Sequence, residues 1–238
     1  MSTLGSIYLG LENNKTELER VLEIFNLSKQ IKYIYDEKNK LVPVDRISKI
    51  GKGVCFDHAR YKSSLAKKFK LTSRTFFYVC YVDGKLCADD KTPGYGHAEN
   101  FIFADGKWYM LSTTGVGRKQ LYSCDYDQLD IVIAGAIKYR SMYIQPTELV
   151  VGATGKDIGS VVASNMAAYF NRAVDRVTWE VYEVPNFHDT KFDGMTYQKL
   201  TEYVVSHYSP YVFDDKIVEG IRKNNPKYDM WSVLHEVA

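Results

Sequence analysis

A cysteine in a glycine-flanked segment is the strongest candidate for chemistry in this sequence. Cys55 follows Gly51 and Gly53 and begins a helical pattern of apolar residues that continues to Lys70. The unpaired N–H groups at a helix N-terminus favour negative charge, and the thiolate is the reactive form of cysteine. Cys55 therefore lies where a nucleophile would be activated, although a small buried cysteine in a core helix gives the same pattern.

A histidine that could act with this thiol begins a predicted hairpin. Residues 97–104 and 107–113 are rich in aromatic and apolar residues, as strands are, and Asp105–Gly106 between them favours a type I′ turn. Because imidazole changes charge near neutral pH, His97 is a candidate general base. A histidine on a mixed strand face is also a common structural residue.

The hairpin predicts which side chains surround His97. If the loop has two residues, Phe101 lies opposite Met110, and Glu99 lies opposite Ser112. Side chains alternate between the faces of a strand, so Glu99, Ser112 and His97 are expected on one face.

Helices and strands in mixed order must position these residues. Apolar spacing and turn residues predict the following elements. We expect helices at residues 16–35, 157–172, 196–208, 213–224 and 227–237, and strands at 74–82, 97–104, 107–113 and 178–184. Residues 131–140 fit either a strand or a short buried helix. Asp83–Gly84 predicts a hairpin turn after the strand at 74–82.

The composition argues against several classes of function. The chain has 238 residues, 45% of them hydrophobic and 25% charged, with a net charge of +2, so nothing indicates nucleic-acid binding. Its four cysteines show neither a CxxC pair nor a zinc spacing, and we expect no metal or other cofactor. It has no apolar run long enough to span a bilayer and no signal-peptide pattern. We expect a cytoplasmic protein without membrane partners, and the sequence favours no oligomeric state.

Both motifs together resemble the transglutaminase-like superfamily of papain-fold cysteine enzymes. The segment GKGVCFDHARYKSSLAKKFKLTSRTFFYV is similar to the family's nucleophile segment, in which G-x-C-x-D/E opens the central helix and an arginine begins the next strand. The segment GHAENFIFADGKWYMLSTT is similar to its histidine segment, in which a strand with His turns through D-G-x-W into a strand ending in Asp-x-Thr. The resemblance covers residues 15–115.

The resemblance implies an α+β fold and thiol chemistry. Residues 1–145 would form a papain-like core, with the helix that bears Cys55 packed on an antiparallel sheet, and residues 146–238 a mostly helical C-terminal extension. Cys55 would attack an amide or peptide bond of a peptide or protein substrate, with His97 as the base and a thioester as the intermediate. We favour hydrolysis or deamidation over cross-linking. Three upstream side chains are candidates for the second oxyanion donor: Gln30, Tyr33 and Tyr35.

The sequence departs from the family pattern at Ser112, where the family has the aspartate that orients the histidine. A neutral replacement of that carboxylate costs about 10⁴ in rate in serine proteases. Glu99 stands where the family commonly has an aromatic residue, and residues i and i+2 of a strand are about 6.5–7 Å apart. We hypothesise that Glu99 takes the role of the aspartate, with Ser112 making room. The alternative for Glu99 is a rim residue exposed to solvent. For the whole chain, the alternatives are a catalytically degenerate domain that serves as a protein-binding module, and an enzyme that transfers acetyl groups to arylamines.

Overall fold

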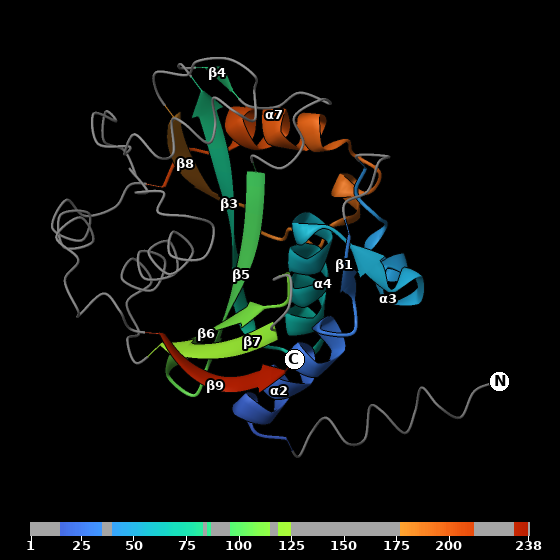
Figure 1. The fold of residues 1–238 in the computed structure, drawn as a ribbon, viewed down its shortest axis with the longest axis vertical. Helices are drawn as coiled ribbons and strands as arrows, with labels where there is room; N and C mark the ends of the chain where they lie inside the picture. The colour runs from blue at the N-terminus through green and yellow to red at the C-terminus, as the bar shows by residue number, and fades with distance from the viewer. Residues whose placement is uncertain are drawn as a thin grey trace, which may run out of the picture.

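An antiparallel sheet of seven strands organises the fold. The structure is a computed structural model that describes residues 15–34, 40–82, 85–86, 96–114, 119–124, 177–211 and 231–237. The strands follow the order β4-β3-β5-β6-β7-β9, and β8 pairs with β3. Their bounds are β3 (Thr72–Val82), β4 (Lys85–Leu86), β5 (Gly96–Ala104), β6 (Lys107–Ser112), β7 (Lys119–Cys124), β8 (Val177–Glu183) and β9 (Trp231–Val237). In Figure 1, β3 and β5 run nearly vertically and β6, β7 and β9 nearly horizontally, so the sheet is strongly twisted.

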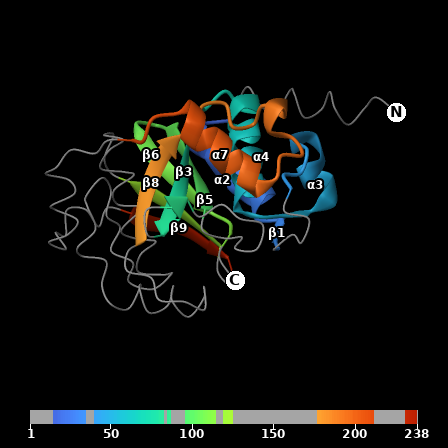
Figure 2. The same cartoon turned by 90° about the horizontal axis from the view of Figure 1, so that it is seen from above.

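The helices gather on one side of this sheet. Seen from above, they lie together beside the strands (Figure 2). They are α2 (Glu17–Ser28), α3 (Ile47–Ile50), α4 (Cys55–Lys68) and α7 (Tyr197–His207), with short 3₁₀ helices at Val44–Arg46 and Thr190–Phe192. The described residues therefore confirm the predicted α+β class.

The hairpin of β5 and β6 has the predicted turn and register. Asp105 and Gly106 have φ values of 47° and 74°. Two successive positive φ angles define a type I′ turn, which suits the twist of the flanking strands. Phe101 pairs with Met110 as the two-residue loop requires. The sequence prediction is confirmed up to this pair.

The first helix is shorter than predicted. Its start is confirmed by a capping box of Thr16 and Glu19, but α2 ends at Ser28 instead of continuing to residue 35. Lys32–Tyr33 instead form β1, which pairs in parallel with β2 (Lys52–Gly53). This small sheet holds the glycine segment in place immediately before Cys55.

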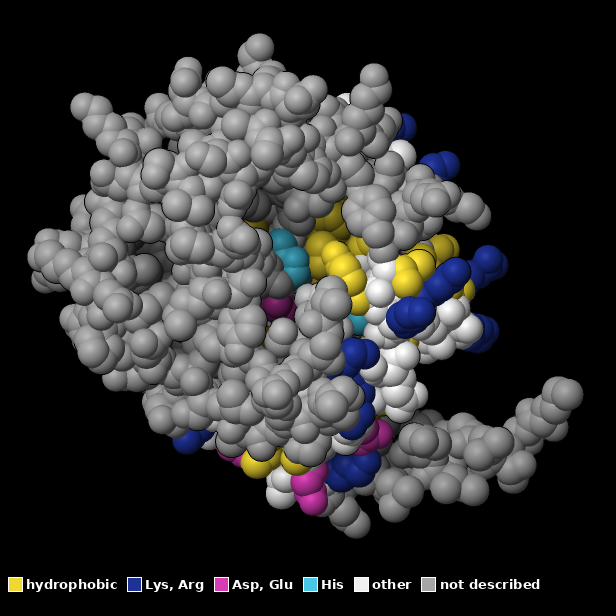
Figure 3. Space-filling model, in the orientation of Figure 1, with side chains coloured by type: hydrophobic (Ala, Val, Ile, Leu, Met, Phe, Trp, Pro, Cys, Tyr) yellow, Lys and Arg dark blue, Asp and Glu magenta, His cyan; other side chains and the backbone are white. Residues whose placement is uncertain are grey.

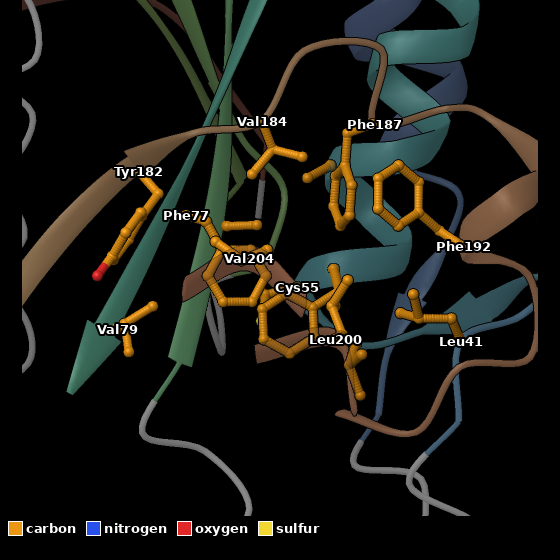
Figure 4. Packing of buried hydrophobic residues seen from close by; sticks show 14 residues of the cluster. Leu41, Cys55, Phe77, Val79, Tyr182, Val184, Phe187, Phe192, Leu200 and Val204 are labelled. Carbon is orange, nitrogen blue, oxygen red and sulfur yellow. The ribbon is translucent and has the colours of Figure 1, made fainter. Parts of the chain in front are cut away.

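Two hydrophobic clusters fix α4 against the sheet. One joins its first turns to β3, β5 and α7, and Figure 4 shows Cys55 among Phe77, Leu200 and Val204 of this cluster. The other joins the last turns of α4 to α2 and to β5, β6 and β7. Burial of these apolar faces is the main favourable contribution to such packing.

The described segments beyond residue 145 belong to the same sheet and core. β8 pairs with β3, α7 packs in the cluster of Cys55, and β9 pairs with β7. The helix predicted at 227–237 is wrong, because Trp231–Val237 form a strand on the edge of β7. The predictions for residues 131–140, 157–172 and 213–224 lie outside the described residues, and the boundary at residue 145 stays a prediction. No helix in the described ranges is long and apolar enough to cross a membrane.

Candidate active site

Cys55 is the first residue of α4 and lies at the edge of the core. Its side chain belongs to the cluster formed with β3 and α7, and the residue is 7% exposed. Gly51 ends α3 with a left-handed φ of 66°, a conformation that glycine adopts without strain. Gly53 is needed for a different reason, since an added Cβ would lie 2.7 Å from the Cβ of Asp57. The two glycines thus allow the backbone to turn sharply and pack closely just before α4 begins.

Asp57 holds the start of this helix. Its buried carboxylate accepts hydrogen bonds from the backbone N–H of Val54 at 3.1 Å and of Val42 at 2.9 Å. The negative charge also suits the positive end of the helix. The prediction that Asp57 serves the helix and not the chemistry agrees with these contacts.

His97 and Glu99 come together on β5. The Nε2 atom of His97 lies 3.4 Å from Oε2 of Glu99, and the two side chains are 16% and 2% exposed. The ring of Tyr78 lies beside that of His97, with centroids 6.0 Å apart. Histidine and acidic side chains are visible beside hydrophobic ones near the middle of the face in Figure 3. Glu99 is therefore buried, and the alternative of a solvent-exposed carboxylate is wrong.

Lys62 is the residue that the sequence prediction missed. Its ammonium group, 1% exposed, donates to Oε1 of Glu99 at 2.7 Å and to the backbone oxygen of Leu111 at 2.8 Å. Lys62 lies seven residues after Cys55, on the apolar stripe that includes Ala59. A lysine is almost never buried unless it is paired, so its place on this stripe was a signal that the sequence carried.

Lys62 connects α4 to two strands at the point where their pairing ends. The last pair of the β5–β6 ladder is Phe101 with Met110. Just beyond it, Lys62 binds Glu99 of β5 and Leu111 of β6. Residue 98, which lies between His97 and Glu99 on β5, packs in the same cluster as the first turn of α4. The helix that begins with the thiol is thus held directly against the strand that carries the histidine.

Ser112 is the last residue of β6. It is half-buried at the end of β6 and pairs with Gln120 of β7. The pairing predicted between Glu99 and Ser112 falls beyond the last pair of the β5–β6 ladder. Its hydroxyl makes no hydrogen bond with any described residue. A part for Ser112 in the site stays a prediction.

His58, one turn after Cys55, is a structural residue, as the sequence suggested. It is fully buried, and its Nδ1 lies 3.0 Å from Oγ1 of Thr113. Burial, followed by the positive charges of Lys62 and Lys119, lowers the pKa of His58 to about 3. The imidazole of His58 is therefore neutral at physiological pH.

The candidates for the oxyanion donor differ in position. Gln30 is exposed in the turn after α2. Tyr33 lies on β1 opposite Gly53, with its ring centroid 6.2 Å from that of His58. Tyr35 lies outside the described residues. Of the two candidates that the structure describes, Tyr33 is the one that lies beside the segment leading to Cys55.

Within the described ranges, no group of three or more His, Cys, Asp or Glu side chains is arranged to hold a metal ion. Comparison of the chain with protein-family models gives no match, and comparison with curated proteins finds no relative.

Proposed function

We propose that this protein is a transglutaminase-like cysteine enzyme with a papain-like core, which acts on an amide or peptide bond of a peptide or protein substrate. The observation that carries the proposal is the buried Glu99 carboxylate, 3.4 Å from Nε2 of His97, on a strand packed against the helix that begins with Cys55. Thiol, imidazole and carboxylate are the three groups that such acyl transfer requires.

The orientation of His97 assigns its two nitrogens. Nε2 faces Glu99, so we assign to Nδ1 the role of taking the proton of the Cys55 thiol. The thiolate then attacks the substrate carbonyl carbon, and the imidazolium returns the proton to the leaving amine as the C–N bond breaks. Water attacks the resulting thioester, His97 accepts a proton from it, and the carboxylic acid leaves with the thiol restored.

Glu99 supports the charged form of His97 in this cycle. A carboxylate beside the second ring nitrogen fixes the tautomer and stabilises the imidazolium that forms when the thiol ionises. The positive end of α4 stabilises the thiolate at the same time. Glu99 is thus proposed to take the role of the aspartate that Ser112 replaces. We favour hydrolysis or deamidation as the outcome and the cytoplasm as the compartment, where a thiol stays reduced.

The direct test is turnover on a complex mixture of natural peptides. The wild-type protein and Cys55→Ala are incubated with the same mixture, and mass spectrometry compares cleaved and deamidated peptides. The proposal predicts new products with the wild type alone, and their loss in His97→Gln. Identical peptide patterns for the wild type and Cys55→Ala would contradict it and would favour the alternative of a protein-binding module.

A further inference from the structure

The buried lysine next to the site is an unusual feature of the central helix. Lys62 is 1% exposed and Glu99 is 2% exposed, and their ammonium and carboxylate groups lie 2.7 Å apart. Burying either charge alone would be expensive, and removing one partner of such a pair leaves the other charge uncompensated. The charge of each residue in this position therefore depends on the other.

The two oxygens of Glu99 face different partners. Oε1 accepts the hydrogen bond of Lys62, and Oε2 faces Nε2 of His97. Lys62 is itself held by the backbone oxygen of Leu111, so its ammonium group is fixed between two strands. Fixing one carboxylate oxygen by a charge-assisted hydrogen bond orients the plane that contains the other.

We propose that Lys62 is a positioning residue of the reaction: it keeps the Glu99 carboxylate charged and turned so that its second oxygen faces His97. The role of Lys62 in catalysis rests on the proposed function, whereas its effect on the titration of His97 does not. Lys62 would act on His97 through Glu99, and through it on the ionisation of the Cys55 thiol.

Lys62 has two opposite effects on the protonation of His97. The positive charge of Lys62 acts directly against a second positive charge on the imidazole, as it does at His58, whose pKa it lowers. Through Glu99, the same lysine favours the imidazolium. Among the described residues, His58 of α4, Tyr78 of β3 and Lys119 of β7 also face this region. These three residues are the same in every variant of Lys62 and Glu99, so they do not account for a difference between the variants.

A histidine titration by NMR separates the two effects in the full-length protein. The chain has five histidines, and His97→Gln identifies the signal. We expect Lys62→Met to lower the titration midpoint of His97 by about one pH unit, because an uncompensated Glu99 takes up a proton or turns away. In the Glu99→Gln background, the same substitution should raise the midpoint or leave it unchanged, since only the direct repulsion is then removed.

Alkylation of Cys55 measures the consequence for the thiol. Iodoacetamide should react about tenfold more slowly with Lys62→Met than with the wild type near neutral pH. Lys62→Arg should restore much of the rate. Lys67→Met is the matched control, since it removes an exposed positive charge from the same helix and should leave the rate unchanged.

A His97 midpoint that is unchanged or raised in Lys62→Met would overturn the inference, even if the variant is less stable. If Lys62→Met does not fold, the comparison of Lys62→Gln with Lys62→Arg replaces it, with a lowered midpoint expected in the first alone. A wild-type thiol no more reactive than free cysteine would contradict the proposed function, and the titration would still decide the role of Lys62.

Discussion

At the scale of single residues, burial separates two histidines that lie close to the same charges. His58 is fully buried beside Thr113, whereas the side chain of His97 is 16% exposed beside Glu99. Burial and nearby positive charges lower the pKa of His58 from its ordinary 6.5 to about 3. The unfolded chain therefore binds a proton at this residue in a pH range where the folded protein does not.

This difference predicts how stability depends on pH. As pH falls from 6.5 towards 3, His58 should destabilise the fold by about 1.4 kcal/mol per pH unit at most, because the unfolded state takes up the proton first. His58→Asn keeps a polar partner for Thr113 but cannot titrate. Urea unfolding at about pH 7 and about pH 5 should show a smaller loss of unfolding free energy in the variant.

The absolute stability of His58→Asn is not the test, since the smaller side chain leaves space in the core. An equal loss of unfolding free energy between the two pH values in both proteins would show that His58 is not the titrating group.

Contacts within the site could be predicted from the sequence where the two residues are close to each other in the chain. Glu99 and His97 are two positions apart on one strand, so their approach follows from the spacing of alternate residues. The contact of Lys62 with Glu99 joins a helix to a strand 37 residues away. Helical periodicity predicts the face of α4 on which Lys62 lies, but not the charge that it meets there.

At the scale of elements, the start of α4 depends on close packing between Gly53 and Asp57. The carboxylate of Asp57 binds the backbone of Val54 and of Val42, and a Cβ on Gly53 would lie 2.7 Å from its Cβ. Displacement of Asp57 would also move Cys55, since both residues belong to the first turn of the helix.

Gly53→Ala should therefore cost stability and thiol reactivity together. We expect a loss of about 1–3 kcal/mol from overpacking and slower alkylation of Cys55. Gly51→Ala is the matched control: its Cβ would meet open space, and its positive φ costs about 1–2 kcal/mol without touching Asp57. Unfolding and alkylation of both variants are compared. Unchanged alkylation in Gly53→Ala would refute this account of the helix start.

The sequence predicts those elements that are determined by their own residues and not by pairing with a distant segment. Asp105–Gly106 determines its own turn, and the register of β5 and β6 follows from it. β1 was missed because its two residues are defined by pairing with β2, which lies further along the chain. The apolar spacing of residues 231–237 fits a helix or a strand, and only the exposed edge of β7 decides between them.

At the scale of the whole molecule, the end of the chain returns to complete the sheet around the site. β9 covers the edge of β7, and β8 covers one edge of β3. The buried Arg60 of α4 donates to the backbone oxygens of Val42, Phe187 and Asp189 and pairs with Asp193. The central helix is thus held by segments that precede it and segments that follow it in the chain.

Removal of β9 should destabilise the molecule as a whole. Deleting residues 231–238 exposes the edge of β7, and unpaired strand edges favour aggregation. We expect a lower thermal unfolding midpoint and light scattering at lower temperature than in the full chain. Deletion of Ala238 alone is the control. An unchanged midpoint after the longer deletion would show that β9 contributes little to the fold.

The most direct test of the central claim is the pH dependence of iodoacetamide alkylation at Cys55, in the wild type and in Glu99→Gln. A thiol activated by His97 and Glu99 should react rapidly at neutral pH, with a midpoint well below the value of about 8.5 for free cysteine. The midpoint should move towards that value in Glu99→Gln. A wild-type midpoint equal to that of free cysteine would contradict the account, and an unchanged midpoint in Glu99→Gln would show that Glu99 is not the supporting carboxylate.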